Sequence, residues 1–172
     1  SAQISGDLIV TAHERTAPLV LPAIKKFQDE NPNTVIKFVA SAALLKLEYG
    51  EAHVAIRSGP KPEQPDNVVQ HYLDLKLGLY AHKSYVARHG VPKSKEDYKD
   101  HRFVCWEPSN SNFPFIGWIK HNIPQSSKSL ISENQGVIDQ ALFEGMGIGF
   151  HPETYAQKRT DLVEVYPPQP DW

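Results

Sequence analysis

The chain has 172 residues, of which 40% are apolar and 22% are charged, and this balance predicts an ordinary soluble fold rather than a disordered chain. A formal net charge of −2 lacks the basic excess that binding to a phosphate backbone requires, so these residues are not expected to bind DNA by themselves. The single cysteine, Cys105, excludes an internal disulfide and is expected to be a small buried core residue, and no apolar run reaches the roughly 18 residues that span a bilayer.

The first part of the chain alternates predicted strands and helices. Strands are predicted at residues 6–13, 34–40 and 53–58, because each is short, apolar and rich in β-branched residues. A helix is predicted from Thr16, as its N-cap, to the Asn-Pro-Asn stop that begins at Asn31, and a second helix over residues 41–50. This order of elements predicts a parallel sheet with helices on both faces.

The second part begins after a proline-rich loop at residues 60–67 and contains a second α/β unit. A long strand at residues 73–81 is predicted to connect the two units. Further strands are predicted at residues 101–107, 129–134, 148–152 and 162–166, and helices at residues 83–89, 116–122, 135–147 and 153–159.

Several well-known catalytic and metal-binding motifs are absent from the sequence. The eight histidines include no His-Glu-x-x-His pair and no Cys-x-x-Cys accompanies them, so no metal site is expected. The segment GMGIG at residues 145–149 follows a helix and precedes a strand, which is the reverse of a dinucleotide-binding loop, so we expect it to end the helix. There is no P-loop and no G-x-S-x-G, although composition alone does not exclude a serine hydrolase.

Polar residues follow the predicted strands, at the edge where open parallel sheets bind ligands. Arg15 and Arg57 would favour a small anion there, most simply a carboxylate, whereas Glu107 would oppose it. Helix capping alone would account for the polar residues at helix starts, and a solvated surface position would account for each arginine. The junction residues are His13, Glu14, Arg15, Thr16, Ser41, Ala42, Arg57, Ser58, His82, Trp106, Glu107, Asn134 and His151.

The order of these segments resembles the effector-binding domain of LysR-type transcriptional regulators, from Gly6 to about Pro168. The segment LPAIKKFQDENPNTVIKF is similar to the family pattern L-P-x-L-x-x-F followed by Pro-x-Val. SAALLKLEYGEAHVAIRSG resembles the family's helix, glycine and Asp-(Leu/Val)-Ala-Ile-Arg strand. Together with GDLIVTAH, LGLYAHKSYVARHGVP and ENQGVIDQALFEGMGIGFHP, these make five individually weak matches in the expected order.

The resemblance implies an α/β fold of two Rossmann-like lobes, similar to type II periplasmic binding proteins, with an effector cleft between the lobes. Lobe I is expected over residues 6–76 and lobe II over residues 77–168. His53 stands where the family usually has an acidic residue. The chain ends at Trp172, so lobe I is expected to lack the family's usual return strand and C-terminal helix, and the winged helix-turn-helix that binds DNA is expected upstream of Ser1.

The resemblance also implies a function. A small effector would bind between the lobes and shift their relative angle, and dimer contacts would pass the change to the DNA-binding domain. A cytoplasmic homodimer is implied, or a tetramer in the full-length protein, with DNA contacted only through the N-terminal domain and with no membrane, cofactor, metal or catalytic residue involved. Together with Arg57, the residues implied for the cleft are His13, Arg15, Thr16, Ser41, Ala42, Leu79, Ala81, Trp106, Glu107 and Asn134.

Two other functions remain open from the sequence. A solute-binding protein of a transport system shares this fold and would require a signal peptide, which the N-terminal segment SAQISGDLIV does not resemble. Because Ser1-Ala2 looks like a cloning remnant, we expect further residues upstream. A small α/β enzyme would require a base and a nucleophile in contact, for example His13 or His151 with Ser41.

Overall fold

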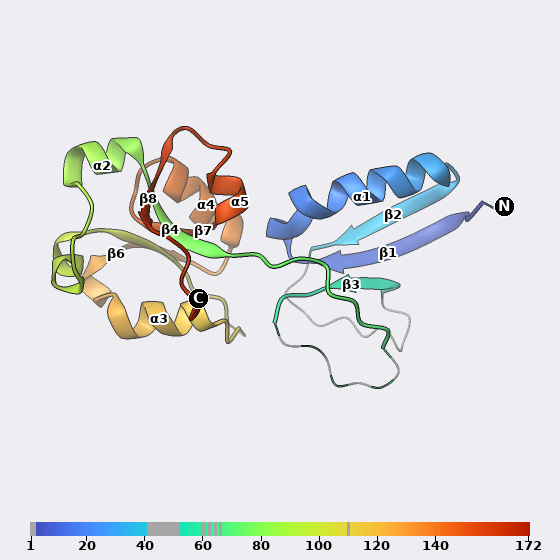
Figure 1. The fold of residues 1–172 in the computed structure, drawn as a ribbon, viewed down its shortest axis with the longest axis horizontal. Helices are drawn as coiled ribbons and strands as arrows, with labels where there is room; N and C mark the ends of the chain where they lie inside the picture. Colours follow the sequence, from blue (N-terminus) through green and yellow to red (C-terminus); the bar gives the residue numbers. More distant parts are fainter. Residues whose placement is uncertain are drawn as a thin grey trace. The chain divides into compact units, whose positions relative to one another are not determined.

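The chain divides into two compact units, Ser1–His71 and Tyr72–Trp172 (Figure 1). The computed structural model describes residues 3–40, 52–59, 61, 63, 65, 67–109 and 111–172. The helix predicted over residues 41–50, with Ser41 and Ala42, lies outside the described residues. The two-unit α/β architecture agrees with the fold class predicted from the sequence.

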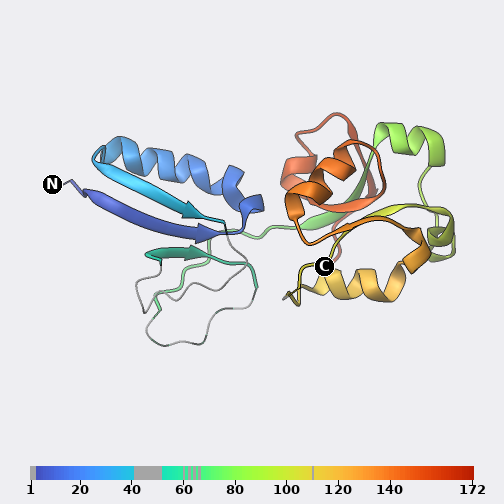
Figure 2. The same ribbon diagram turned by 180° about the vertical axis from the view of Figure 1, so that it is seen from behind.

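The first unit contains a parallel sheet with strand order β2-β1-β3. The central strand β1 (Gly6–Ala12) pairs with β2 (Thr34–Val39) over six residues and with β3 (Val54–Ile56) over three. Helix α1 (Ala17–Glu30) connects β1 to β2 and runs alongside these two strands in both views (Figures 1 and 2). The predicted parallel sheet is confirmed, and its ordering follows from the β-strand–helix–β-strand connection.

The second unit has a mixed arrangement of strands. β4 (Leu77–His82) lies between β7 (Gly149–Pro152) and β8 (Leu162–Tyr166), and both pairings are antiparallel. β5 (Phe103–Trp106) and β6 (Lys128–Ser132) form a parallel pair. The helices are α2 (Lys83–His89), α3 (Pro114–Asn122), α4 (Gln135–Phe143) and α5 (Glu153–Ala156), with 3-10 turns at Lys95–Asp100 and Gln125–Ser127.

Several predicted boundaries in this unit were wrong, and helix α4 ends at Phe143 instead of residue 147. The strand predicted over residues 73–81 begins only at Leu77, because Leu73 is exposed and residues 73–76 pair with no strand among the described residues. α3 begins two residues earlier than predicted, because Pro114 occupies the first helical position, where its missing N–H costs nothing. α5 ends at Ala156 instead of residue 159.

The core of the second unit is rich in aromatic residues. Phe150 on β7 packs against Trp118 of α3 and against Trp172 near the chain's last residues, with ring centroids 5.7 and 4.9 Å away. Such pairs contribute about 0.5–1.5 kcal/mol each beyond the area they bury. Cys105 lies in this core as predicted, and burial raises the pKa of its thiol to about 12, so the thiolate that would react is scarce.

The turn after α4 depends on glycine for close approach between segments. α4 ends at Phe143, and Gly145 has φ +76°, so Gly145 is the helix stop that the GMGIG segment was expected to contain. A Cβ at Gly145 would lie 2.5 Å from Ser84 Oγ, and one at Gly147 would lie 2.9 Å from the Arg102 carbonyl oxygen. These glycines therefore pack segments together.

We expect Gly145→Ala to lower the free energy of unfolding by at least about 2 kcal/mol, because alanine adds a left-handed backbone penalty and a steric clash. Gly117→Ala is the matched control, since Gly117 lies inside α3 with open space around its Cα, and it should raise stability by about 1 kcal/mol. Urea denaturation of both variants measures the difference. Equal stability of the two would contradict the packing role of this turn.

A buried hydrogen-bonded pair joins α2 to the start of β5. The Tyr85 hydroxyl lies 2.7 Å from His101 Nδ1 and accepts the Arg102 backbone N–H at 3.0 Å. Burial, with a smaller contribution from His89, lowers the pKa of His101 below its ordinary value of 6.5. Protonation of His101 is thus disfavoured in the folded state.

Because the unfolded chain takes up this proton more readily than the folded one, the His101 contribution to stability is present above pH 6.5 and is lost as the pH falls through the folded pKa. We expect the melting temperature to fall more steeply between pH 7.5 and pH 5 in the wild type than in His101→Asn. The Asn Oδ1 keeps an acceptor for Tyr85 without titrating, and the other histidines are common to both proteins. Parallel pH profiles would contradict this assignment.

Candidate functional site

The carboxyl ends of β1 and β3 bring two of the predicted site segments to one edge of the first sheet. Ala12 on β1 pairs with Ile56 on β3, so the residues that follow them, His13 and Arg57, leave the sheet from neighbouring positions. Because the strands are parallel, their free ends and the N–H groups beyond them face the same side. The junction at His13 to Thr16 and the junction at Arg57 therefore form one candidate binding edge.

The first junction is ordered by its own hydrogen bonds. His13 Nδ1 accepts the Arg15 backbone N–H at 3.2 Å, and Thr16 Oγ1 donates to the His13 carbonyl at 2.6 Å. Thr16 was predicted to cap α1 with its side chain, and this was wrong. A 3-10 turn, η1 (Glu14–Thr16), precedes α1, so Thr16 already has helical backbone angles and the capping side chain is His13.

The second junction projects from a very short strand. Arg57 and Ser58 follow β3 and are exposed, and Gly59 at φ +119° lets the chain turn away from the sheet. At the other end of β3, His53 binds β1 twice: its N–H donates to the Ile9 carbonyl at 2.8 Å, and its ring Nδ1 accepts the Ile9 N–H at 2.8 Å. From the sequence, His53 was notable only as a departure from the family pattern. Its hydrogen bonds to Ile9 were not predicted.

The hydrophobic residues predicted for the site in the second unit are core residues. Leu79 and Ala81 on β4 are 1% and 0% exposed and pack in the core of this unit. Trp106 is 7% exposed and stacks on Phe113 and Phe115, and its Nε1 donates to the Glu133 carbonyl at 2.8 Å. The Trp106 ring, which was expected to stack on a ligand, therefore stacks on two phenylalanine rings of the protein.

The two polar residues predicted for this unit also have structural partners. Glu107 pairs with Lys128, whose side chain is 6% exposed, at 2.6 Å. This pair neutralises the carboxylate that was expected to oppose an anionic ligand. Asn134 Oδ1 accepts the Val137 N–H at 3.1 Å, so the capping interpretation of Asn134 is confirmed.

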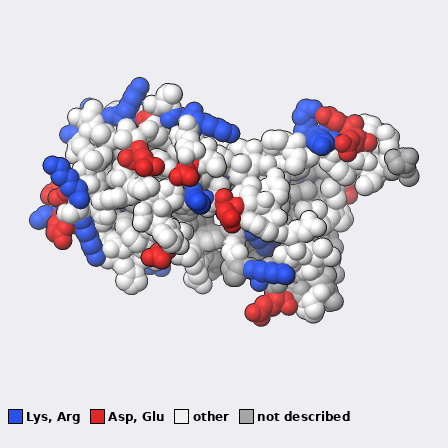
Figure 3. Space-filling model, viewed as in Figure 1, with Lys and Arg blue, Asp and Glu red and all other residues white. Residues whose placement is uncertain are grey.

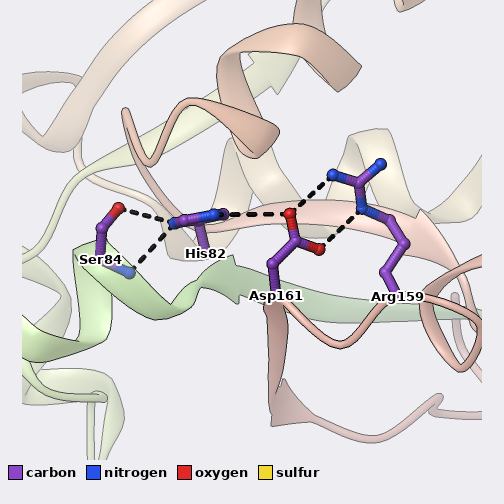
Figure 4. A network of polar contacts seen from close by, with 4 residues as sticks. All are labelled: His82, Ser84, Arg159 and Asp161. Atoms are coloured by element: carbon purple, nitrogen blue, oxygen red, sulfur yellow. Dashed lines mark hydrogen bonds and ion pairs between the residues drawn. The ribbon is translucent and has the colours of Figure 1, made fainter.

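Figure 4 shows a polar network at the start of α2 in the second unit. His82 Nδ1 lies 2.7 Å from Ser84 Oγ and accepts the Ser84 N–H at 3.1 Å, while its Nε2 lies 3.5 Å from Asp161. Arg159 binds Asp161 through two hydrogen bonds of 3.0 and 2.8 Å, which hold the pKa of Asp161 below its ordinary value.

Ser84, His82 and Asp161 are the residue types of a hydrolase triad, but their geometry is that of a helix cap. The single lone pair of His82 Nδ1 is shared between the hydroxyl and the N–H of Ser84, as in an N-cap. Gly145 packs so close that a Cβ there would lie 2.5 Å from Ser84 Oγ, and Arg159 already neutralises Asp161. The network joins α2 to the segment before β8.

Comparison with known proteins identifies the family. A family model described as the LysR substrate binding domain matches residues 1–172, so the chain belongs to this family. It is 28% identical to the HTH-type transcriptional regulator CrgA of Neisseria meningitidis serogroup C over 97 residues, which are 55% of this chain and 31% of CrgA. The match thus spans about a third of the length of that curated relative.

Solved structures of the same family share the fold. The regulatory domain of CrgA from Neisseria meningitidis superposes with a TM-score of 0.75 at 20% identity, covering 94% of this chain and 81% of that chain. The regulatory domain of AphB from Vibrio vulnificus gives 0.72 at 22% identity, covering 98% and 84%. The family match favours a LysR-type domain over the transport alternative.

Two negative observations apply to the described part of the chain. No helix there is both long and apolar enough to cross a bilayer. Within the same residues, no three His, Cys, Asp or Glu side chains are grouped closely enough to hold a metal ion.

Removal of the Glu107 carboxylate should show that its pair with Lys128 is structural. We expect Glu107→Gln to lower the free energy of unfolding by about 2 kcal/mol, because it leaves a buried ammonium uncompensated. Asp29→Asn is the control. It breaks the exposed Lys25–Asp29 pair and should change stability by less than about 0.5 kcal/mol. Denaturant titration compares them, and equal losses would show that burial of Lys128 does not matter.

Proposed function

We propose that this chain is the effector-sensing domain of a LysR-type transcriptional regulator and that it binds a small carboxylate. The single observation that carries the regulator assignment is the family match over residues 1–172. The carboxylate is supported by the arrangement at the edge of the first sheet, where Arg57 leaves β3 beside His13 and the first junction contains Arg15.

The proposed contact set is narrower than the residues named from the sequence. It consists of His13, Arg15, Thr16 and Arg57, with Ser41 and Ala42 kept from the resemblance. Leu79, Ala81, Trp106, Glu107 and Asn134 are left out, because they belong to the second unit, whereas the two junctions that β1 and β3 bring together belong to the first. An arginine pair and backbone N–H groups would supply the charge and the donors that a carboxylate requires.

We infer the rest of the mechanism from the family. Effector binding would favour one arrangement of the two lobes, and contacts within a homodimer, or a tetramer of the full-length protein, would carry the change to a DNA-binding domain elsewhere in the protein. This action on DNA implies the cytoplasm. Basic and acidic side chains are interspersed on the face in Figure 3, which fits a domain that leaves DNA contact to another part of the protein.

Catalysis is not part of this proposal. Of the pairs considered from the sequence, Ser41 lies outside the described residues, and His13 Nδ1 accepts a backbone N–H. In the His82 network, Nδ1 accepts the Ser84 backbone N–H as a helix cap does. A periplasmic solute-binding role would predict tight ligand binding with no effect on DNA affinity of the full-length protein.

A thermal-shift screen tests the ligand class. Small carboxylates, amino acids, neutral sugars and alkylamines would be compared, and we expect only carboxylates to raise the melting temperature. Arg57→Ala should weaken the best carboxylate at least tenfold, because the charged hydrogen bond is lost. Arg88→Ala is the control, since Arg88 is an equally exposed arginine in α2 of the second unit, and it should leave binding unchanged.

Stabilisation by an uncharged or cationic compound alone would contradict the carboxylate. Equal loss of binding in Arg57→Ala and Arg88→Ala would contradict the site, since it would mean that only overall charge matters.

A further inference from the structure

The short strand β3 pairs with β1 over only three residues, and the side chain of His53 adds one hydrogen bond to this pairing. Three residue pairs, Val10 to Ala12 against Val54 to Ile56, make up the pairing. Immediately before them, both backbone polar groups of Ile9 bind His53: the carbonyl accepts the His53 N–H, and the Ile9 N–H donates to His53 Nδ1, each at 2.8 Å. The imidazole thus extends the ladder by one bond beyond the end of the strand.

We propose that His53 is the positioning residue for Arg57, because its Nδ1 accepts the Ile9 N–H and so fixes the start of the strand that carries Arg57 at its other end. The proposal deepens and rests on the carboxylate site proposed above. Only the three residues of β3, Val54–Ile56, separate His53 from Arg57, so a slip or release at His53 changes the place of Arg57.

The geometry of the side chain explains which replacements should preserve this role. Nδ1 of histidine and Oδ1 of aspartate or asparagine are both two bonds beyond Cβ, so all three can offer an acceptor at the same reach.

On the neighbouring strands, Asp7 of β1 and Lys37 of β2 are bound to each other at 2.7 Å, and Arg57 lies at the far end of β3. The bond between Ile9 and His53 is exposed, so water competes for it, and its effect should be seen mainly in the order of β3 rather than in global stability.

The test uses amide NMR of the whole 172-residue chain with acetate as the probe. In the wild type, the Ile9 amide should exchange slowly with solvent. His53→Ala should accelerate the exchange of the Ile9 and Arg57 amides and weaken acetate binding, followed at Arg57, about fivefold. His53→Asn and His53→Asp should restore slow exchange and affinity.

Three results of this experiment would each contradict a different part of the proposal. If His53→Ala leaves the Arg57 resonance and its exchange unchanged, His53 does not position Arg57. If Asn and Asp fail to rescue, the acceptor is not the relevant property of His53. If acetate binds to none of the proteins while the Ile9 and Arg57 amides still respond as expected, the positioning role stands and the carboxylate site is contradicted.

Discussion

The parallel pairing of β3 with β1 is the constraint on which the candidate site depends. It is only three residues long, yet it places the end of β3 beside the end of β1, so that Arg57 and His13 leave the sheet as neighbours. A shift of one residue would turn Arg57 to the other face, because side chains alternate along a strand. The longer pairing of β1 with β2 stabilises the sheet, but it carries neither of these two side chains.

Both units use a histidine side chain to bind a backbone N–H at the start of a helical turn. In each, an Ala-His pair stands where a central strand gives way to a helical turn, and the histidine Nδ1 accepts the N–H of the residue two positions later, at Arg15 in one unit and at Ser84 in the other. The histidine therefore satisfies an N–H at the start of the following helical turn. The surroundings differ: in the second unit Asp161, Arg159 and the Gly145 turn enclose the histidine, which leaves a structural junction.

Much of the fold could be predicted from the sequence, because it depends on local patterns. β-branched apolar runs and an Asn-Pro-Asn stop predicted β1, β2 and α1. The errors fell where tertiary context decides. Alternating leucines before Leu77 have no strand to pair with, and a 3-10 turn before α1 moved the cap from Thr16 to His13.

The site was less predictable than the fold, and for a physical reason. Sequence by itself determined the family, the strand ends and the residue types that reach them, since these follow from order and chemistry. Only the tertiary structure decided which of those residues are already occupied: Trp106 stacks within the core, Glu107 pairs with Lys128, and Asn134 caps α4. Partners far apart in the chain make these contacts, so no local pattern reveals them. The same holds for His53, a misfit in the sequence whose acceptor role became visible only once β1 lay beside it.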